Sequence, residues 1–296
     1  MTSDDHWILQ PAACPVCSAD NGRFLGFRGG WAHRSGQGVA VAIVRCRGCG
    51  TSYPNPTPHP RDHSHYDDAT GYFAPGDDAA SVAAFEATLR QAAELTGAPG
   101  RLLDVGCGLG QSLVAAANTG WEAVGIEPSS TFAREGRRRF GVEIEDQVLV
   151  PALFERDSFD VVLFSGVLEH VYDPVGLLQI AGEVLRPGGV VYVDVPNESS
   201  WVQAAGRIAL RARRRDWCIA LSPTFAPFHV VGFSPRALRT AFDHAGLDTV
   251  RVDGYPLSLA SSGLPRPALA LAGAIERGAA RVGRASGLVG WARAGG

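Results

Sequence analysis

A glycine-rich stretch is the part of this sequence whose residue types and spacing point most directly to chemistry. Residues 102–110 read LLDVGCGLG, an apolar run interrupted by Asp104 and followed by Gly106, Gly108 and Gly110. Alternating glycines let a backbone pass close to a ligand, and such loops often hold phosphates. A dinucleotide loop, however, needs glycine where this chain has Gln111, and the carboxylate of Asp104 repels a phosphate. The loop therefore favours a ligand that carries positive charge.

A second carboxylate stands at the end of the next apolar run. Glu127 lies in the segment VGIEPS, and a carboxylate at such a strand end can accept hydrogen bonds from both hydroxyls of a ribose. NAD sites use the same device, so Glu127 alone does not discriminate between ligands. S-adenosylmethionine combines a ribose with an ammonium and a sulfonium group, and it therefore suits Asp104 and Glu127 together.

Two histidines are candidates for a general base. His170 lies in LEHV, just after an apolar strand candidate, and His229 lies in PTFAPFHVVGF. An imidazole with a pKa near neutrality can remove the proton of a hydroxyl acceptor. The alternative for each is a structural role, in which the ring caps a turn or bonds to the backbone.

Four cysteines form two pairs with the spacing of metal-binding knuckles. CPVC places Cys14 beside Cys17, and CRGC places Cys46 beside Cys49. Two such knuckles can share one tetrahedral zinc ion, and four thiolates close its coordination shell, so the ion would be structural. Disulfides or free thiols are the alternative. Cys107 and Cys218 stand alone and are expected to be buried structural thiols.

These residues must be positioned by elements that alternate along the chain. Strands are predicted at 101–105, 122–126, 142–148, 159–164 and 189–195, with helices at 111–119, 129–139 and 174–185 between them and another at 81–96. Strands that alternate with helices form a parallel sheet with right-handed crossovers. Further on, a helix at 234–245, a strand at 247–253, a helix at 266–284 and a last strand at 288–294 are expected.

The remaining segments suggest a two-part organisation. Residues 1–60 would form a zinc-ribbon-like module whose exit, YPNPTPHP, is rich enough in proline to favour an extended linker, and residues 61–296 would form the main domain. Residues 198–233 read as an irregular insertion with a run of arginines between 207 and 215. Three interpretations of that run are open: a solvated helix face, a contact for an acidic acceptor such as a nucleotide-linked sugar, and a contact for anionic lipid.

Composition limits the function classes. Of the 296 residues, 46% are hydrophobic and 19% charged, so the chain is globular, and a net charge of −3 gives no general attraction for nucleic acid. The first residues lack the basic and apolar regions of a signal peptide, and no run of apolar residues is long enough to span a membrane. A cytoplasmic protein with a small-molecule partner is expected.

Four blocks in order carry a family resemblance: LLDVGCGLG, VGIEPS, FDVVLFSGVLEHVYDP and LRPGGVVYVDVPN. Over about residues 98–253 the chain resembles the class I S-adenosylmethionine-dependent methyltransferases. The resemblance implies a Rossmann-like α/β fold with a seven-stranded, mostly parallel sheet, whose antiparallel last strand residues 288–294 would supply. Its small N-terminal module would hold structural zinc.

The resemblance also implies which residues bind the cofactor. Asp104 and the glycine loop would approach the methionine part, and Glu127 the ribose. The other implied contacts are Pro128, Ser129, Val148 and Leu149 at the adenine, Ser165 and Gly166 at the methionine end, and Tyr72, with Tyr66, in an aromatic segment that covers the cofactor.

A knuckle module before such a domain is similar to methyltransferases of bacterial saccharide and secondary-metabolite gene clusters. Methyl transfer to a hydroxyl of a sugar or secondary metabolite is therefore expected. The alternatives are C- or N-methylation of a nucleotide-linked sugar, methylation of RNA, and a descendant that binds the cofactor without methylating. Similar quinone-pathway O-methyltransferases carry E-x-x-E-H at a metal site. Here Gly166 replaces the first acid, so no metal is expected beside His170.

Overall fold

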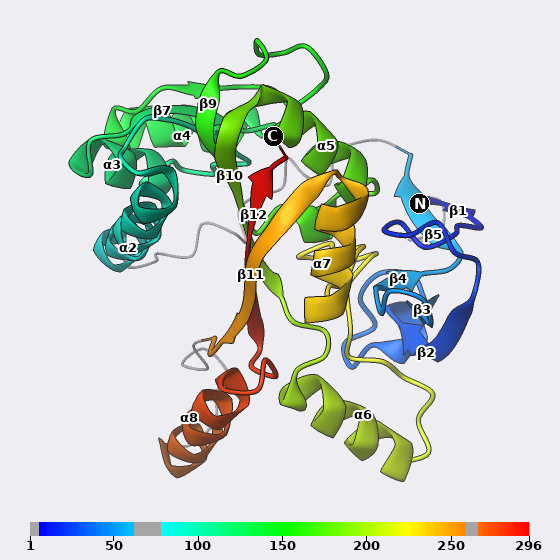
Figure 1. Cartoon of the computed structure of the whole chain (residues 1–296). Helices are drawn as coiled ribbons and strands as arrows, with labels where there is room; N and C mark the ends of the chain where they lie inside the picture. The colour runs from blue at the N-terminus through cyan, green and yellow to red at the C-terminus, as the bar shows by residue number, and fades with distance from the viewer. Residues whose placement is uncertain (1–5, 62–77, 258–265, 296) are drawn as a thin grey trace.

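A seven-stranded sheet forms the centre of the molecule (Figure 1). The computed structural model describes residues 6–61, 78–257 and 266–295. In spatial order the strands are β8 (Ile144–Glu145), β7 (Glu122–Ile126), β6 (Arg101–Val105), β9 (Phe159–Ser165), β10 (Leu185–Pro196), β12 (Gly287–Ala294) and β11 (Leu247–Tyr255). β12 runs antiparallel to both its neighbours, and the pairs from β8 to β10 are parallel. The predicted sheet, including its antiparallel last strand, is confirmed.

Alternate residues of the central strands enter two separate cores, as the period of two in a strand requires. Leu103 and Val162 join the core under α5 (Pro174–Val184) and α7 (Pro235–His244). Leu102 and Val161 join the core under α2 (Asp78–Thr96) and α3 (Gln111–Asn118). Burial on both faces explains why these strands read as nearly continuous apolar runs.

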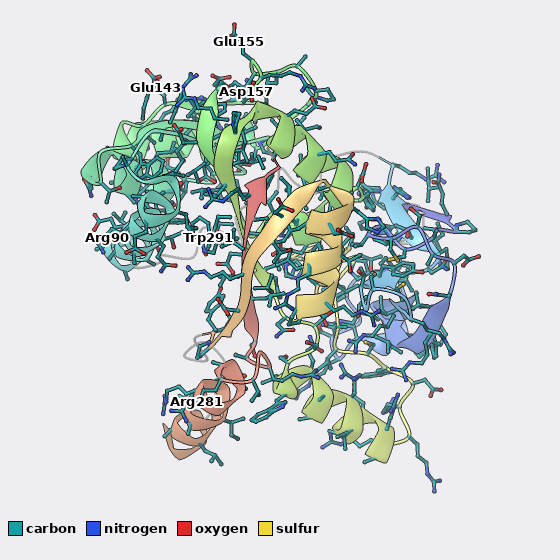
Figure 2. All side chains as sticks on the ribbon, in the orientation of Figure 1. Arg90, Glu143, Glu155, Asp157, Arg281 and Trp291 are labelled. Carbon is teal, nitrogen blue, oxygen red and sulfur yellow. The ribbon has the colours of Figure 1, made fainter. Side chains whose placement is uncertain are left out.

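The second core is closed by aromatic side chains at the antiparallel end of the sheet. Trp291 of β12 is buried on the side of the sheet that faces α2 (Figure 2), and its ring lies 4.9 Å from that of Tyr192. A further helix, α4 (Ser130–Phe140), follows β7, and its N-cap Ser129 accepts a hydrogen bond from the amide of Phe132. None of the helices in the described ranges combines the length and apolar character needed to cross a bilayer.

The N-terminal module consists of two small antiparallel sheets. One contains β2 (Gly22–Arg28), β3 (Val41–Cys46) and β4 (Ser52–Pro54), and the other pairs β1 (Trp7–Gln10) with β5 (Thr57–Pro60). The proline-rich segment is extended, as predicted, but it is not a free linker. It supplies β4 and β5, and proline is tolerated there because these are edge strands.

Three elements differ from the sequence-based prediction. The strand expected at 142–148 is reduced to Ile144–Glu145, because it lies at the sheet edge and pairs with β7 alone. The insertion 198–233 was expected to be irregular, but it contains the twelve-residue helix α6 (Trp201–Ala212), capped by Ser200. The last helix, α8 (Arg266–Ala280), ends a turn earlier than expected.

Candidate functional site

The glycine loop joins β6 to α3 at the carboxyl edge of the sheet. Gly106 and Gly110 adopt positive φ angles of 70° and 85°, which other residues rarely adopt. A Cβ on Gly106 would lie 2.8 Å from a methyl group of Val167, so the loop and the segment after β9 are in close contact. At Gly108 a Cβ would meet nothing within 4 Å, which leaves room for a ligand beside the backbone.

Two buried carboxyl groups flank this loop. Asp104 is 2% exposed; its Oδ2 accepts a hydrogen bond from Ser112, and its Oδ1 has no partner among the described residues. Burial raises the pKa of Asp104 to about 7. Glu127 accepts hydrogen bonds from the amides of Gly108 (3.0 Å) and Ser129 (2.9 Å), and burial raises its pKa as well. The pair forms a desolvated acidic site that suits a cationic, hydroxylated ligand.

The other cofactor candidates lie on loops at the same edge. Ser129 is buried at the start of α4, whereas Pro128 is exposed. Val148 is 54% exposed, and Leu149 is buried in the core that also contains Ile126. Ser165 ends β9, and Gly166 follows it with a positive φ angle of 68°. Tyr66 and Tyr72 lie outside the described residues.

The structure brings together the two histidines that the sequence offered as separate candidates. Their rings are T-shaped with centroids 4.8 Å apart. Glu169 lies between them: its Oε1 is 4.0 Å from Nε2 of His170 and 3.8 Å from Nε2 of His229. The backbone carbonyl of Glu169 accepts hydrogen bonds from the amides of Val230 and Val231, which fixes the segment that carries His229. The three side chains offer ligand atoms within 4.8 Å of one another.

Burial controls the protonation of this cluster. Desolvation lowers the pKa of His170 to about 4 and that of His229 to about 3, so both rings are neutral near pH 7. The backbone at Phe228 and Pro227 hydrogen-bonds to the ring of His170 and opposes this shift, whereas the nearby His170 lowers the pKa of His229 further. Burial raises the pKa of Glu169 to about 8. Two neutral imidazoles beside a carboxyl group can accept a proton and stabilise the resulting charge.

Two further residues of this edge were not singled out from the sequence. Asp194 of β10 accepts a 2.7 Å hydrogen bond from the hydroxyl of Tyr255, and burial raises the pKa of Asp194 to about 6. The carbonyl of Asp194 accepts a hydrogen bond from the amide of Gly166. A signal for Asp194 was present, since it is an acid near the end of an apolar strand, as Glu127 is. Tyr255 could not be placed without the register of β11.

The four knuckle cysteines converge in the N-terminal module. The Sγ atoms of Cys14 and Cys49 are 3.5 Å apart, as are those of Cys17 and Cys46, and all six cysteines of the chain are free thiols. Tetrahedral zinc with Zn–S bonds of about 2.3 Å requires sulfurs roughly 3.8 Å apart. The donor set and its spacing therefore fit one zinc ion. Cys107 and Cys218 are both buried and outside this cluster.

The module contacts the insertion that carries His229. Ser52 of β4 forms a β-bridge with Gly232, and Thr224 exchanges hydrogen bonds with the backbone of Val39 (3.0 and 2.8 Å). The guanidinium of Arg28 donates to the carbonyl of Leu221 at 3.0 Å. The module thus braces the same segment that Glu169 holds from the other side.

Comparison with known proteins agrees with this architecture. The sequence profile of a family described as a methyltransferase domain matches residues 79–252, more than half of the chain. A ubiquinone biosynthesis O-methyltransferase of Ruegeria pomeroyi is 39% identical over 160 residues, which are 52% of this chain and 62% of that protein. One of Methylocella silvestris is 34% identical over 104 residues, 33% of this chain and 41% of that protein. Each of these alignments spans less than two thirds of the relative.

A solved structure shares the fold. A crystal structure described as a SAM-dependent methyltransferase from Archaeoglobus fulgidus superposes with a TM-score of 0.50 at 15% identity, covering 78% of this chain and all of that one. At this identity the likeness concerns the fold alone. Together with the family match and the sheet order, it shows that the chain belongs to the methyltransferase-domain family and has the seven-stranded class I fold.

Proposed function

We propose that the protein transfers a methyl group from S-adenosylmethionine to a hydroxyl of a small-molecule acceptor, such as a sugar or another secondary metabolite. The observation that supports this most strongly is the pair of buried carboxyls, Asp104 and Glu127, around the open backbone of Gly108. The neutral histidine pair lies at the same edge of the sheet. The names of the curated relatives, which refer to O-methylation, support an oxygen acceptor.

The chain's own residues would hold the cofactor by charge and hydrogen bonding. Oδ1 of Asp104, which lacks a partner among the described residues, is free to accept from an ammonium group. Glu127 is oriented by two amides and keeps acceptor capacity for ribose hydroxyls. When bound, the cofactor supplies an electrophilic methyl group on its sulfonium. A buried acidic site of this kind favours a cation over a phosphate.

His229 is the proposed general base, and His170 its positioning residue. The ring of His229 is neutral near pH 7, so it can take the proton of an acceptor hydroxyl as the oxygen forms its new bond to carbon. Its pKa of about 3 is below the near-neutral value expected from the sequence and makes it a weak base by itself; an ionised Glu169, 3.8 Å away, would strengthen it. His170 is held by the backbone at Phe228 and Pro227, so its ring limits the orientation of His229. Burial keeps Glu169 largely protonated near pH 7, but an imidazolium 3.8 Å away would favour its ionisation, and the two charges would then stabilise each other.

The four-cysteine cluster is proposed to hold zinc in a structural role. A closed shell of four thiolates leaves no position for substrate. The ion would cross-link the two knuckles and thereby stiffen the module that contacts the insertion.

Binding of S-adenosylhomocysteine, followed by calorimetry, tests the cofactor assignment. Glu127→Gln keeps the shape of the side chain but replaces the carboxylate, whose two oxygens both accept hydrogen bonds, with a neutral amide. The affinity of this variant for S-adenosylhomocysteine should fall roughly ten- to a hundred-fold. Glu122→Gln is the matched control, because Glu122 begins the same strand with a side chain 78% exposed. Absence of binding by the unaltered protein, or equal affinities for both variants, would refute the assignment.

A further inference from the structure

Helix α6 presents an apolar face to solvent. Trp201, Val202 and Ile208 are 44%, 45% and 68% exposed, and α6 has no buried residue. The exposed apolar positions recur at helical spacing along one face: Trp201, Val202, Ala205, Ile208, Ala209 and Ala212. An amphipathic helix on a protein surface normally turns such a face toward the core, so its exposure requires an explanation.

The inner face of α6 is fixed in place, so the helix cannot simply be rotated. A Cβ on Gly206 would lie 2.2 Å from Cδ1 of Ile219, so the side chain of Ile219 packs directly against the helix backbone there. Gln203 and Arg207 share this inner face and bury polar atoms. The inner face thus combines buried polar atoms with the half-buried Leu210, whereas the most exposed apolar side chains point outward.

Helix α8 repeats the pattern. Its exposed apolar side chains are spaced along one side: Leu271 is 64% exposed and Ile275 44%. Val282, in the turn that follows the helix, is 60% exposed. Both helices lie beyond the same end of the sheet, at the bottom of Figure 1. Their near ends are joined, because the amide of Trp201 donates to the carbonyl of Arg284 at 2.9 Å. We call this combined surface of α6, α8 and their flanking turns the α6–α8 end.

The α6–α8 end is strongly basic, although the chain as a whole carries a net charge of −3. Its exposed arginines are Arg211, Arg213, Arg214, Arg215, Arg277, Arg281 and Arg284. Figure 2 labels Arg281, which directly follows the end of α8. In the segments 201–217 and 266–284 the acids are Asp216, which is exposed, and Glu276, which is buried and accepts hydrogen bonds from the amide and hydroxyl of Ser286.

We propose that the α6–α8 end docks on an anionic lipid surface. Exposed apolar side chains flanked by exposed arginines match a bilayer interface, where the apolar side chains enter the acyl boundary and the arginines meet anionic headgroups. A second copy of this chain fits less well, because a symmetric contact would bring arginines against arginines. With no spanning helix among the described ones, such binding is peripheral.

This end lies at the same edge of the sheet as the candidate site. β10 ends at Pro196 just before α6, and the antiparallel β12 begins at Gly287 just after α8, so both helices attach at the carboxyl edge of the sheet. Docking would bring that edge close to the lipid. It follows, on the basis of the proposed function, that the acceptor would be a molecule held in the membrane surface.

Flotation of the full chain with vesicles tests the docking. Binding is expected to vesicles of phosphatidylcholine containing phosphatidylglycerol, to be absent with phosphatidylcholine alone, and to weaken as salt is added. The double variant Arg213→Ser/Arg214→Ser should lose roughly thirty-fold in partitioning. Ile208→Glu/Leu271→Glu should abolish binding.

The matched controls change the same residue types elsewhere. Arg134→Ser/Arg156→Ser removes two exposed arginines far from α6 and α8, and Val250→Glu alters an exposed apolar residue of β11. Both should bind vesicles as the unaltered protein does.

Two outcomes would overturn the docking: unaltered protein that stays free of anionic vesicles, or a dimer that only Ile208→Glu/Leu271→Glu dissociates. S-adenosylhomocysteine affinity, measured on each variant, reports folding. It also separates failure of the docking from failure of the proposed function.

Discussion

At the scale of the residue, Asp104 determines how cofactor binding depends on pH. Burial raises its pKa to about 7, and an ammonium ligand pairs with the ionised form. Below pH 7 a proton must leave Asp104 before the ligand binds, so the affinity for S-adenosylhomocysteine should fall as the pH decreases from 8 to 6. Well below the pKa of Asp104, the affinity should fall by at most about tenfold for each pH unit.

The variant Asp104→Asn isolates this effect. It cannot ionise, so its affinity should be lower than that of the unaltered protein at pH 8 and nearly independent of pH between 6 and 8. Calorimetry in buffers with different ionisation enthalpies should also show proton release on binding to the unaltered protein at pH 6.5. The same pH dependence in both proteins would assign the titration to another group.

His229 is expected to act on the acceptor rather than on the cofactor. His229→Gln should lower kcat by roughly a hundred- to ten-thousand-fold and leave S-adenosylhomocysteine affinity unchanged. The control is His244→Gln, because His244 is exposed at the end of α7. The measurement is turnover with any acceptor identified by screening nucleotide sugars and phenolic metabolites.

Other outcomes would reassign the cluster. Full turnover by His229→Gln would remove the base role from this residue. Turnover that depends on added Mg²⁺ or Mn²⁺ would instead mean that Glu169, His170 and His229 hold a metal, which their spacing within 4.8 Å permits.

At the scale of the element, the sequence was sufficient for the sheet but not for the insertion. The strands at 101–105 and 122–126 could be located because burial in the sheet leaves short, mostly apolar runs. Helix α6 was missed although its apolar residues recur at helical spacing. The segment lies outside the alternation of strands and helices, and its arginines were interpreted as part of an irregular insertion. The meeting of His170 and His229 was also beyond prediction, since it depends on how residues 222–231 fold back onto Glu169.

The four-cysteine module should affect turnover more than cofactor binding. Its contacts reach residues 221–232 of the insertion, whereas the cofactor residues lie on loops after β6, β7 and β9. Cys46→Ser should remove the metal, lower kcat strongly and change S-adenosylhomocysteine affinity by less than about threefold. Metal content by mass spectrometry, kcat and affinity are the measurements.

A suitable control is Cys218→Ser, since Cys218 is a buried thiol in the insertion but outside the cluster. It should keep the metal and most of the turnover. Freshly purified protein without zinc, or metal loss without an effect on kcat, would contradict a structural zinc that braces the insertion.

At the scale of the whole molecule, the module and the methyltransferase core share an interface with polar groups that neither could satisfy alone. The guanidinium of Arg45 donates to the carbonyl of Glu198 at 2.9 Å, and that of Arg28 donates to the carbonyl of Leu221 at 3.0 Å. Ser52 pairs with Gly232 in the same region. Separating the two parts would leave these groups without their partners, at a cost of about 1–3 kcal/mol for each buried one.

The two parts should therefore unfold together. Calorimetry is expected to show one unfolding transition. Zinc release, detected with a chromophoric chelator, should occur at the same temperature. S-adenosylhomocysteine at a hundred times its Kd binds only the folded core and stabilises it by about 2.7 kcal/mol. Because unfolding is coupled, the ligand should raise the temperature of zinc release by as much as it raises the temperature of the calorimetric transition. This is expected although the cysteines lie outside the ligand's binding site. Zinc release at a lower temperature that the ligand does not change would mean that the module unfolds by itself, and that its contacts with the insertion are too weak to position His229.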